Sequence, residues 1–158
     1  MALIPPDPTP TERELHRRFM GAALEEARQG LAEGGIPIGS VLVRAGQIIG
    51  RGRNRRVQRG DPMAHAEIDC LQNAGRQRSY RDTVLYSTLA PCYLCSGAAV
   101  QFGVPEVVIG EARTFPGAPE FLQTHGIQVL NLDLPECYEM MADFIAHHPE
   151  LWNEDIGA

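Results

Sequence analysis

The stretches His65-Ala66-Glu67 and Pro91-Cys92-Tyr93-Leu94-Cys95 determine how this chain of 158 residues is interpreted. His65, Cys92 and Cys95 offer one imidazole and two thiols, which are preferred zinc ligands. Three protein ligands leave one tetrahedral position open, so such a site can hold and activate water. Glu67 follows His65 closely and is the candidate group for exchanging protons with that water. The pattern therefore predicts a catalytic zinc site.

Two other uses of these cysteines compete with a catalytic site. A structural zinc site would recruit Cys70 or another histidine as a fourth ligand. A redox Cys-x-x-Cys pair would leave the upstream His65 and Glu67 unexplained, so we favour it less. Cys70 and Cys137, the two remaining cysteines, fall within helical patterns, and we expect them to be small buried apolar residues.

The spacing of the candidate ligands makes a geometric demand on the fold. Cys92 and Cys95 are three residues apart and would be neighbours on a helix, whose N-terminal partial charge favours thiolates. His65 and Glu67 are two apart and would diverge on a regular helix. They can serve one site only if His65 lies in an irregular first turn or if Glu67 reaches back, and Asp61-Pro62 is consistent with a helix start there.

The apolar periodicity predicts alternating helices and strands. The expected elements are a helix from Thr9-Pro10 to Gly34, a hairpin over 40–50, a helix over 63–73, a strand over 84–89, a helix ending near Gly103, a strand over 106–110, a short helix over 119–125, a strand over 128–132 and a last helix over 133–148. This order predicts an α/β fold, a three-layer α/β/α sandwich around a central mixed sheet of about five strands. We expect residues 11–158 to form one domain and residues 1–10 a flexible N-terminal arm.

Composition narrows the possible functions. Apolar residues make up 44% of the chain, which is enough for a core. No apolar run approaches the ~20 residues of a membrane helix, and we expect a cytoplasmic protein. The net charge of −6 argues against nucleic acid as a partner. The arginines of 51–59 form a local basic patch that we interpret as a solvated loop or hairpin end.

The motif H-x-E followed by P-C-x-x-C resembles that of the cytidine deaminase superfamily. Within it, the chain is most similar to the fungal-type zinc-dependent cytosine deaminases, and the resemblance runs from the first helix to the C-terminus. Its landmarks are Gly34–Gly39, Gly50–Asn54, His65–Glu67, Thr88–Cys92, Val108–Glu111 and Trp152–Gly157. The chain departs from the pattern at Ala66, where that family has glycine, and at Tyr93-Leu94.

The resemblance implies hydrolytic deamination of a free nucleobase, cytosine to uracil and ammonia, with Zn²⁺ as cofactor and Glu67 as proton shuttle. It implies that Asn54 holds the carbonyl edge of the ring and Asp155 accepts from its amino group. The backbone N–H of Ala66 and the backbone C=O of Ala90 would form the remaining hydrogen bonds to the ring. Apolar walls around the ring would come from Phe115, Trp152, Leu89 and Ile36. A homodimer and a role in pyrimidine salvage are also implied.

Three alternatives stay open on the sequence. The substrate could be guanine or another amino-substituted heterocycle. The chain could be a tRNA adenosine deaminase, which the arginine patch favours and the acidic net charge opposes. A zinc-stapled scaffold without activity is the third, and it predicts bound metal with no turnover.

Overall fold

A five-stranded mixed sheet forms the centre of the computed structural model, which describes residues 6–158. In spatial order the strands are β2 (Gln47–Arg53), β1 (Gly39–Arg44), β3 (Thr83–Ser87), β4 (Glu106–Ile109) and β5 (Gln128–Asn131). Strand β1 is antiparallel to both of its neighbours, whereas β3, β4 and β5 are parallel. The predicted mixed sheet of about five strands is confirmed.

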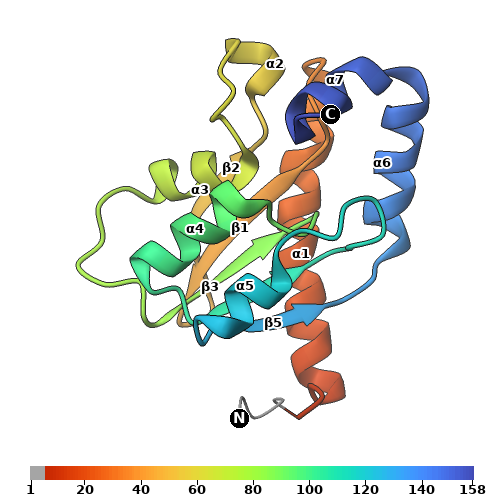
Figure 1. The fold of residues 1–158 in the computed structure, drawn as a ribbon. Coiled ribbons are helices and arrows are strands. Elements are labelled where there is room, and N and C mark those ends of the chain that lie inside the picture. Colours follow the sequence, from red (N-terminus) through yellow and green to blue (C-terminus); the bar gives the residue numbers. More distant parts are fainter. Residues whose placement is uncertain (1–5) are drawn as a thin grey trace.

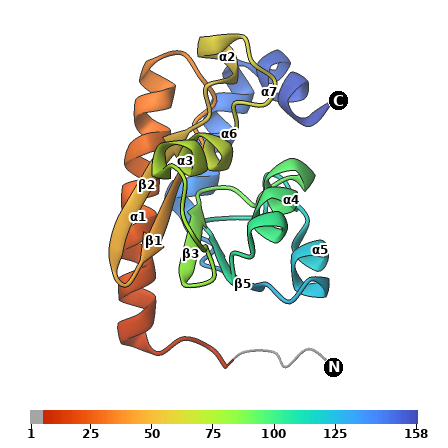
Figure 2. The ribbon, with the colours of Figure 1, turned by 90° about the vertical axis from the view of Figure 1, so that its left-hand side faces the viewer.

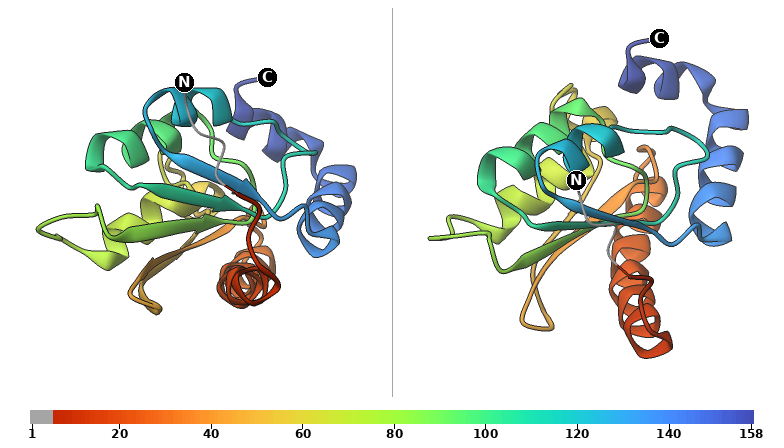
Figure 3. Two further views of the ribbon diagram at one scale, coloured as in Figure 1. Left: turned by 90° about the horizontal axis from the view of Figure 1, so that it is seen from below. Right: turned by 60° about the horizontal axis from the view of Figure 1, so that its bottom comes forward.

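Helices cover both faces of this sheet. On one face, α1 (Pro10–Ala32) and α6 (Pro135–His147) enclose an apolar cluster that includes Phe19, Val41 and Val108. On the other face, α3 (Ala66–Ala74), α4 (Tyr93–Phe102) and α5 (Pro119–Thr124) pack over Leu85 and Val107. Figures 2 and 3 show α1 on the opposite side of the sheet from α4 and α5. The predicted three-layer α/β/α sandwich is therefore confirmed.

Local sequence signals explain two of the element boundaries. Thr9 and Glu12 form a reciprocal capping box at the start of α1, which satisfies two backbone N–H groups. Ala45 and Gly46 both have positive φ angles, as the tight turn between β1 and β2 requires.

The structure corrects several predicted boundaries. The helix expected to begin at Met63 begins at Ala66. The backbone N–H groups of Met63, Ala64 and His65 form hydrogen bonds in tight turns, to Asp61 and to the Met63 C=O, and not the i to i−4 bonds of a helix. The strand expected to reach Leu89 ends at Ser87. The helix expected to end near Gly103 is α4, and it begins at Tyr93 because Cys92 has an extended backbone and serves as the N-cap.

Two helices were missing from the prediction, and both lie at the same end of the molecule (Figure 1). These are α2 (Arg56–Arg59), which is a single turn, and α7 (Pro149–Ile156), which follows the break at His148. Trp152 of α7 is buried in an apolar cluster with Ala66, Leu89 and other residues. Helix α7 therefore covers the end of the sheet from which α3 and α4 begin.

The predicted N-terminal arm falls partly outside the described residues. Residues 1–5 are not described, residues 6–9 precede α1 without regular structure, and Pro10 already belongs to the helix. Over residues 6–158, no helix combines the length and the apolar character that crossing a membrane would need.

Candidate active site

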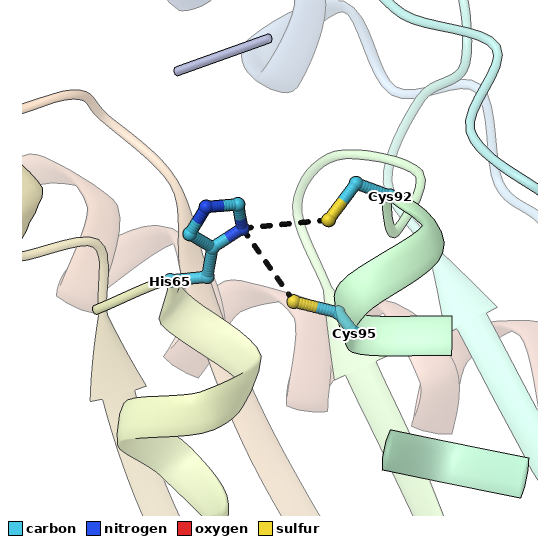
Figure 4. Close-up of side chains that lie close together, drawn as sticks. All are labelled: His65, Cys92 and Cys95. Carbon is cyan, nitrogen blue, oxygen red and sulfur yellow. Dashed lines mark hydrogen bonds between the residues drawn. The ribbon is translucent and has the colours of Figure 1, made fainter. Parts of the chain in front are cut away.

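His65, Cys92 and Cys95 meet where α3 and α4 begin. The Nδ1 atom of His65 lies 3.4 Å from the Cys92 sulfur and 3.6 Å from the Cys95 sulfur. Figure 4 shows both sulfurs facing this same ring nitrogen. The ligand atoms of the three side chains all lie within 4.8 Å of one another, and among residues 6–158 this is the one group of potential metal ligands that meets this condition.

The three ligand atoms fit a tetrahedral zinc ion. Bond lengths of roughly 2.3 Å to sulfur and 2.05 Å to nitrogen, at a tetrahedral angle, separate the two ligand atoms by about 3.6 Å. The observed separations of 3.4 and 3.6 Å agree with this value. The donor set of one imidazole and two thiolates is also one that zinc prefers.

Helix starts place all three ligands. His65 and Cys92 are the N-caps of α3 and α4, with extended backbones at ψ of 158° and 179°. Cys95 follows in the first turn of α4, so both helix N-termini direct their partial positive charge toward the thiolates. The N-cap position of His65 also explains how Glu67, in the first turn of α3, can serve the same site.

Cys70 is not a fourth ligand. Its thiol is fully buried and donates a hydrogen bond to the C=O of Gly50 at 3.5 Å, away from the three ligands. Burial raises the pKa of Cys70 to about 12, which keeps it a thiol. Cys137 is likewise buried, in the cluster beneath α1 and α6. The expectation that both are small core residues is confirmed, and a site closed by Cys70 is contradicted.

Glu67 is buried next to the metal site. Only 4% of it is exposed, and the hydroxyl of Ser87, at the end of β3, donates a hydrogen bond to its Oε1. Burial raises the pKa of the Glu67 carboxyl. A carboxyl whose pKa is raised toward neutrality can both accept and return a proton.

The metal-free ligands are held as a charged hydrogen-bonded group. The hydrogen bond from Cys95 is the main cause that lowers the pKa of Cys92 to about 4. The same hydrogen bond with Cys92 raises the pKa of the Cys95 thiol well above its usual value. The hydrogen bond with Cys92 raises the pKa of His65 to about 9. At pH 7, His65 and Cys95 are therefore protonated and Cys92 is a thiolate.

Zinc binding should consequently release protons. Zinc needs a neutral imidazole and thiolates, so binding at pH 7 should expel about two protons, from His65 and Cys95. The apparent affinity should rise about 10²-fold per pH unit below the His65 pKa of about 9, and about tenfold per unit above it while Cys95 stays protonated. Calorimetry in buffers of different ionisation enthalpy measures the proton count. A count of zero at pH 7 would contradict this charge state.

Asp155 and Asn54 form a buried polar pair beside His65. The Asn54 amide donates to Asp155 Oδ1 at 3.3 Å, and the same oxygen lies 3.6 Å from His65 Nε2. Asn54 is 1% exposed, and the Asp155 side chain is 6% exposed. Asp155 is therefore placed to orient the His65 ring, as partners of metal-binding histidines commonly do.

Two of the metal ligands, His65 and Cys92, line one cavity of about 420 Å³ together with Glu67, Asn54 and Asp155. This volume is near the lower end of the range of roughly 300–1,000 Å³ that is typical of small-molecule binding sites. Its walls include most of the expected residues, namely Asn54, His65, Ala66, Glu67, Leu89, Ala90, Cys92, Phe115, Trp152 and Asp155. Phe115 and Trp152 meet edge to face, with ring centroids 6.2 Å apart. Ile36 lies outside the lining, fully buried in the cluster behind Ala66, and Ile38 takes its place.

Sequence reasoning missed two supporting contacts. Ser87 carried no motif that distinguished it from other strand residues. Arg56 reaches α7, with its guanidinium 2.9 Å from Glu154 and 3.9 Å from Asp155. The only available signal for Arg56 was its position two residues after Asn54 in an arginine-rich stretch.

Comparison with known proteins assigns this architecture to a family. The family model for the cytidine and deoxycytidylate deaminase zinc-binding region matches residues 13–111, which hold every metal ligand and Glu67. The chain belongs to this deaminase family. It is a zinc-dependent deaminase, and the resemblance noted on the sequence is confirmed.

Several relatives of this deaminase differ in the activity their names state. A cytosine deaminase of Candida albicans is 40% identical over 144 residues, covering 89% of this chain and 96% of the relative. A tRNA-specific adenosine deaminase of Streptococcus pyogenes is 35% identical over 147 residues, covering 85% and 92%. Membership of the family therefore establishes the type of reaction, and the substrate has to be inferred from the residues of the site.

Solved structures of other deaminases share the fold. One from a study of A-to-I editing by tRNA:A34 deaminases has a TM-score of 0.70 at 31% identity, covering 78% of this chain and 99% of that one. A guanine deaminase from Bacillus subtilis has a TM-score of 0.57 at 28% identity, covering 72% and 71%.

Proposed function

We propose that this deaminase hydrolyses cytosine to uracil and ammonia. The observation that carries the proposal is the buried Asn54–Asp155 pair facing the same cavity as Glu67 and the zinc ligands. An amide and a carboxylate offer both a donor and an acceptor, which suits a ring whose carbonyl and amino groups are on the two sides of one ring nitrogen, as in cytosine. The similarity to the Candida albicans cytosine deaminase, which extends over 89% of the chain, supports this choice.

Each polar group has a role in this proposal. Asn54 donates to the ring carbonyl, and Asp155 accepts from the amino group while keeping its contact with His65. Ala66 is the first residue of α3, so its N–H has no partner within the helix and can donate to the ring. Ala90, whose N–H is used by the Glu111 C=O, offers its own C=O to the substrate.

Proton transfer falls to Glu67. When bound by His65, Cys92 and Cys95, zinc supplies a Lewis acid that lowers the pKa of water toward neutrality. Glu67 takes one proton from the attacking water and donates it to the ring nitrogen. It then takes the remaining proton of the added hydroxyl and passes it to the amino group, which leaves as ammonia while the ring carbonyl forms. Ser87 holds the carboxylate in place through Oε1. Trp152, Phe115 and Leu89 surround the ring with apolar surface, which strengthens these polar contacts.

The arginine patch does not favour a nucleic-acid substrate. Arg51 and Arg59 are exposed, as expected of a solvated patch. Every arginine of the patch nevertheless lies 2.8–3.8 Å from a carboxylate oxygen. These arginines are Arg51, Arg53, Arg55, Arg56 and Arg59. Their charge is thus largely neutralised within the protein, which leaves little for phosphate groups. We therefore place tRNA last among the substrates.

We further propose that the enzyme works as a homodimer in the cytoplasm, in pyrimidine salvage. The start of helix α4, next to the zinc site, carries two neighbouring exposed apolar side chains, Tyr93 at 76% and Leu94 at 37% exposed. Surfaces of this kind commonly mark interfaces between proteins. Sedimentation of the purified protein distinguishes a dimer from a monomer.

A panel of substrates tests the proposed specificity. Zinc-loaded protein is incubated with cytosine, guanine, adenine and an anticodon stem-loop, and ammonia release is followed. We expect cytosine to have the highest kcat/KM, by about 10²-fold or more over adenine, which has no carbonyl group to pair with the Asn54 amide. Efficient turnover of guanine with none of cytosine would reverse this assignment.

A further inference from the structure

Asp69 is a buried carboxylate that none of the roles above uses. It lies on α3, two residues after Glu67, and its side chain is 2% exposed. Its Oδ2 accepts hydrogen bonds from the Arg53 backbone N–H at 3.0 Å and from Arg55 Nε at 3.1 Å. The Arg59 guanidinium lies 3.8 Å from Oδ1. A buried charge of this kind is retained only with such partners.

These contacts hold the chain on both sides of Asn54. Arg53, just before Asn54, is bound through its backbone, and Arg55, just after it, through its side chain. Asn54 itself directly follows β2, and its N–H donates to the Ile38 C=O. The backbone that carries the Asn54 amide is therefore fixed to α3 directly.

The packing of β2 against α3 makes this attachment rigid. A Cβ on Gly52 would lie 2.1 Å from the Cys70 backbone N and 2.7 Å from the Ala66 C=O, so only glycine allows the observed approach. Helix α3 also begins next to His65 and carries Glu67. Helix α3 thus carries Glu67, follows directly after the metal ligand His65, and through Asp69 contacts the residues on both sides of Asn54.

We infer that Asp69 is a positioning residue that sets the distance between the Asn54 amide and the reacting end of the site. This rests on the proposed role of Asn54 in holding the ring. Loss of the Asp69 charge would weaken the contacts on both sides of Asn54 and leave Arg55 and Arg59 without their buried partner. Small displacements of a substrate-positioning group have large effects on rate.

A double-mutant cycle separates positioning from general stability. Asp69→Asn, Asn54→Ala and the double variant are loaded with zinc, and kcat/KM, KM and the zinc content are measured, in single turnover where rates are low. We expect Asp69→Asn to lower kcat/KM about tenfold, chiefly through KM, with one zinc per chain retained. In the Asn54→Ala background the same change should have less than about a twofold effect.

Asp82→Asn, in the exposed pair with Arg44, should leave all parameters unchanged. If Asp69→Asn does not fold, Arg55→Met removes one arm of the contact and enters the same cycle. Equal losses in both backgrounds, or no loss in the parent enzyme, would overturn the inference. Absence of cytosine turnover by the parent would instead refute the proposed substrate, and the cycle would then use the base that the panel identifies.

Discussion

Glu67→Gln is expected to lower kcat for cytosine by about 10²–10⁴-fold, the usual contribution of a positioned general acid–base group. The amide is nearly isosteric and can still accept from Ser87, but it cannot take a proton from water. Zinc content and the thermal unfolding midpoint should stay close to those of the parent. Stopped assays of uracil formation together with metal analysis measure both.

Glu106→Gln provides the matched control for this change. Glu106 is a partly buried glutamate on β4 that lies 4.0 Å from His16 and contacts no residue of the site. The same substitution there should leave kcat unchanged. If Glu67→Gln retained the parent rate with full zinc occupancy, Glu67 would have no part in proton transfer.

Cys95→Ala is expected to abolish both zinc retention and deamination. Removing partners outside the ligand sphere already costs roughly 10–100-fold in metal affinity or activity, so the loss of a ligand should exceed ~10²-fold. The two remaining ligands, His65 and Cys92, cannot define a tetrahedral site with a single open position. Metal analysis after gel filtration and an activity assay with added zinc test this expectation.

Cys70→Ala isolates the ligand role from the effect of removing a buried thiol. Both sulfurs belong to side chains with no exposed surface, but Cys70 donates to the Gly50 C=O and is not among the metal ligands. Its loss should lower stability modestly and leave zinc content and kcat intact. Zinc loss in Cys70→Ala, or full activity in Cys95→Ala, would contradict the assignment of the ligands.

The metal site could be predicted because its determinants are local. Each ligand is at or near a helix start, and proline and turn residues before the helices reveal those starts in the sequence. The contact of Asp155 with His65 joins residues 90 positions apart and depends on how α7 folds back over the sheet. Periodicity carries no information on such an approach, so only the resemblance pointed to Asp155.

Local backbone geometry explains the error at Ile36. Residues two apart in an extended segment point the same way, which would place Ile36 and Ile38 on one wall. The Ile38 N–H instead donates to the Ile36 C=O, a tight turn that breaks the alternation and sends only Ile38 to the cavity. Helix α2 was missed for a related reason, since a single turn of four residues has no apolar period.

The most direct test is a zinc titration of the metal-free protein, with ammonia release from cytosine measured at each addition. Activity should rise in proportion to zinc, reach its plateau at one ion per chain and be abolished again by chelation. Stoichiometric zinc binding with no turnover of any base in the panel, or turnover that persists in the metal-free protein, would contradict a catalytic zinc site at His65, Cys92 and Cys95.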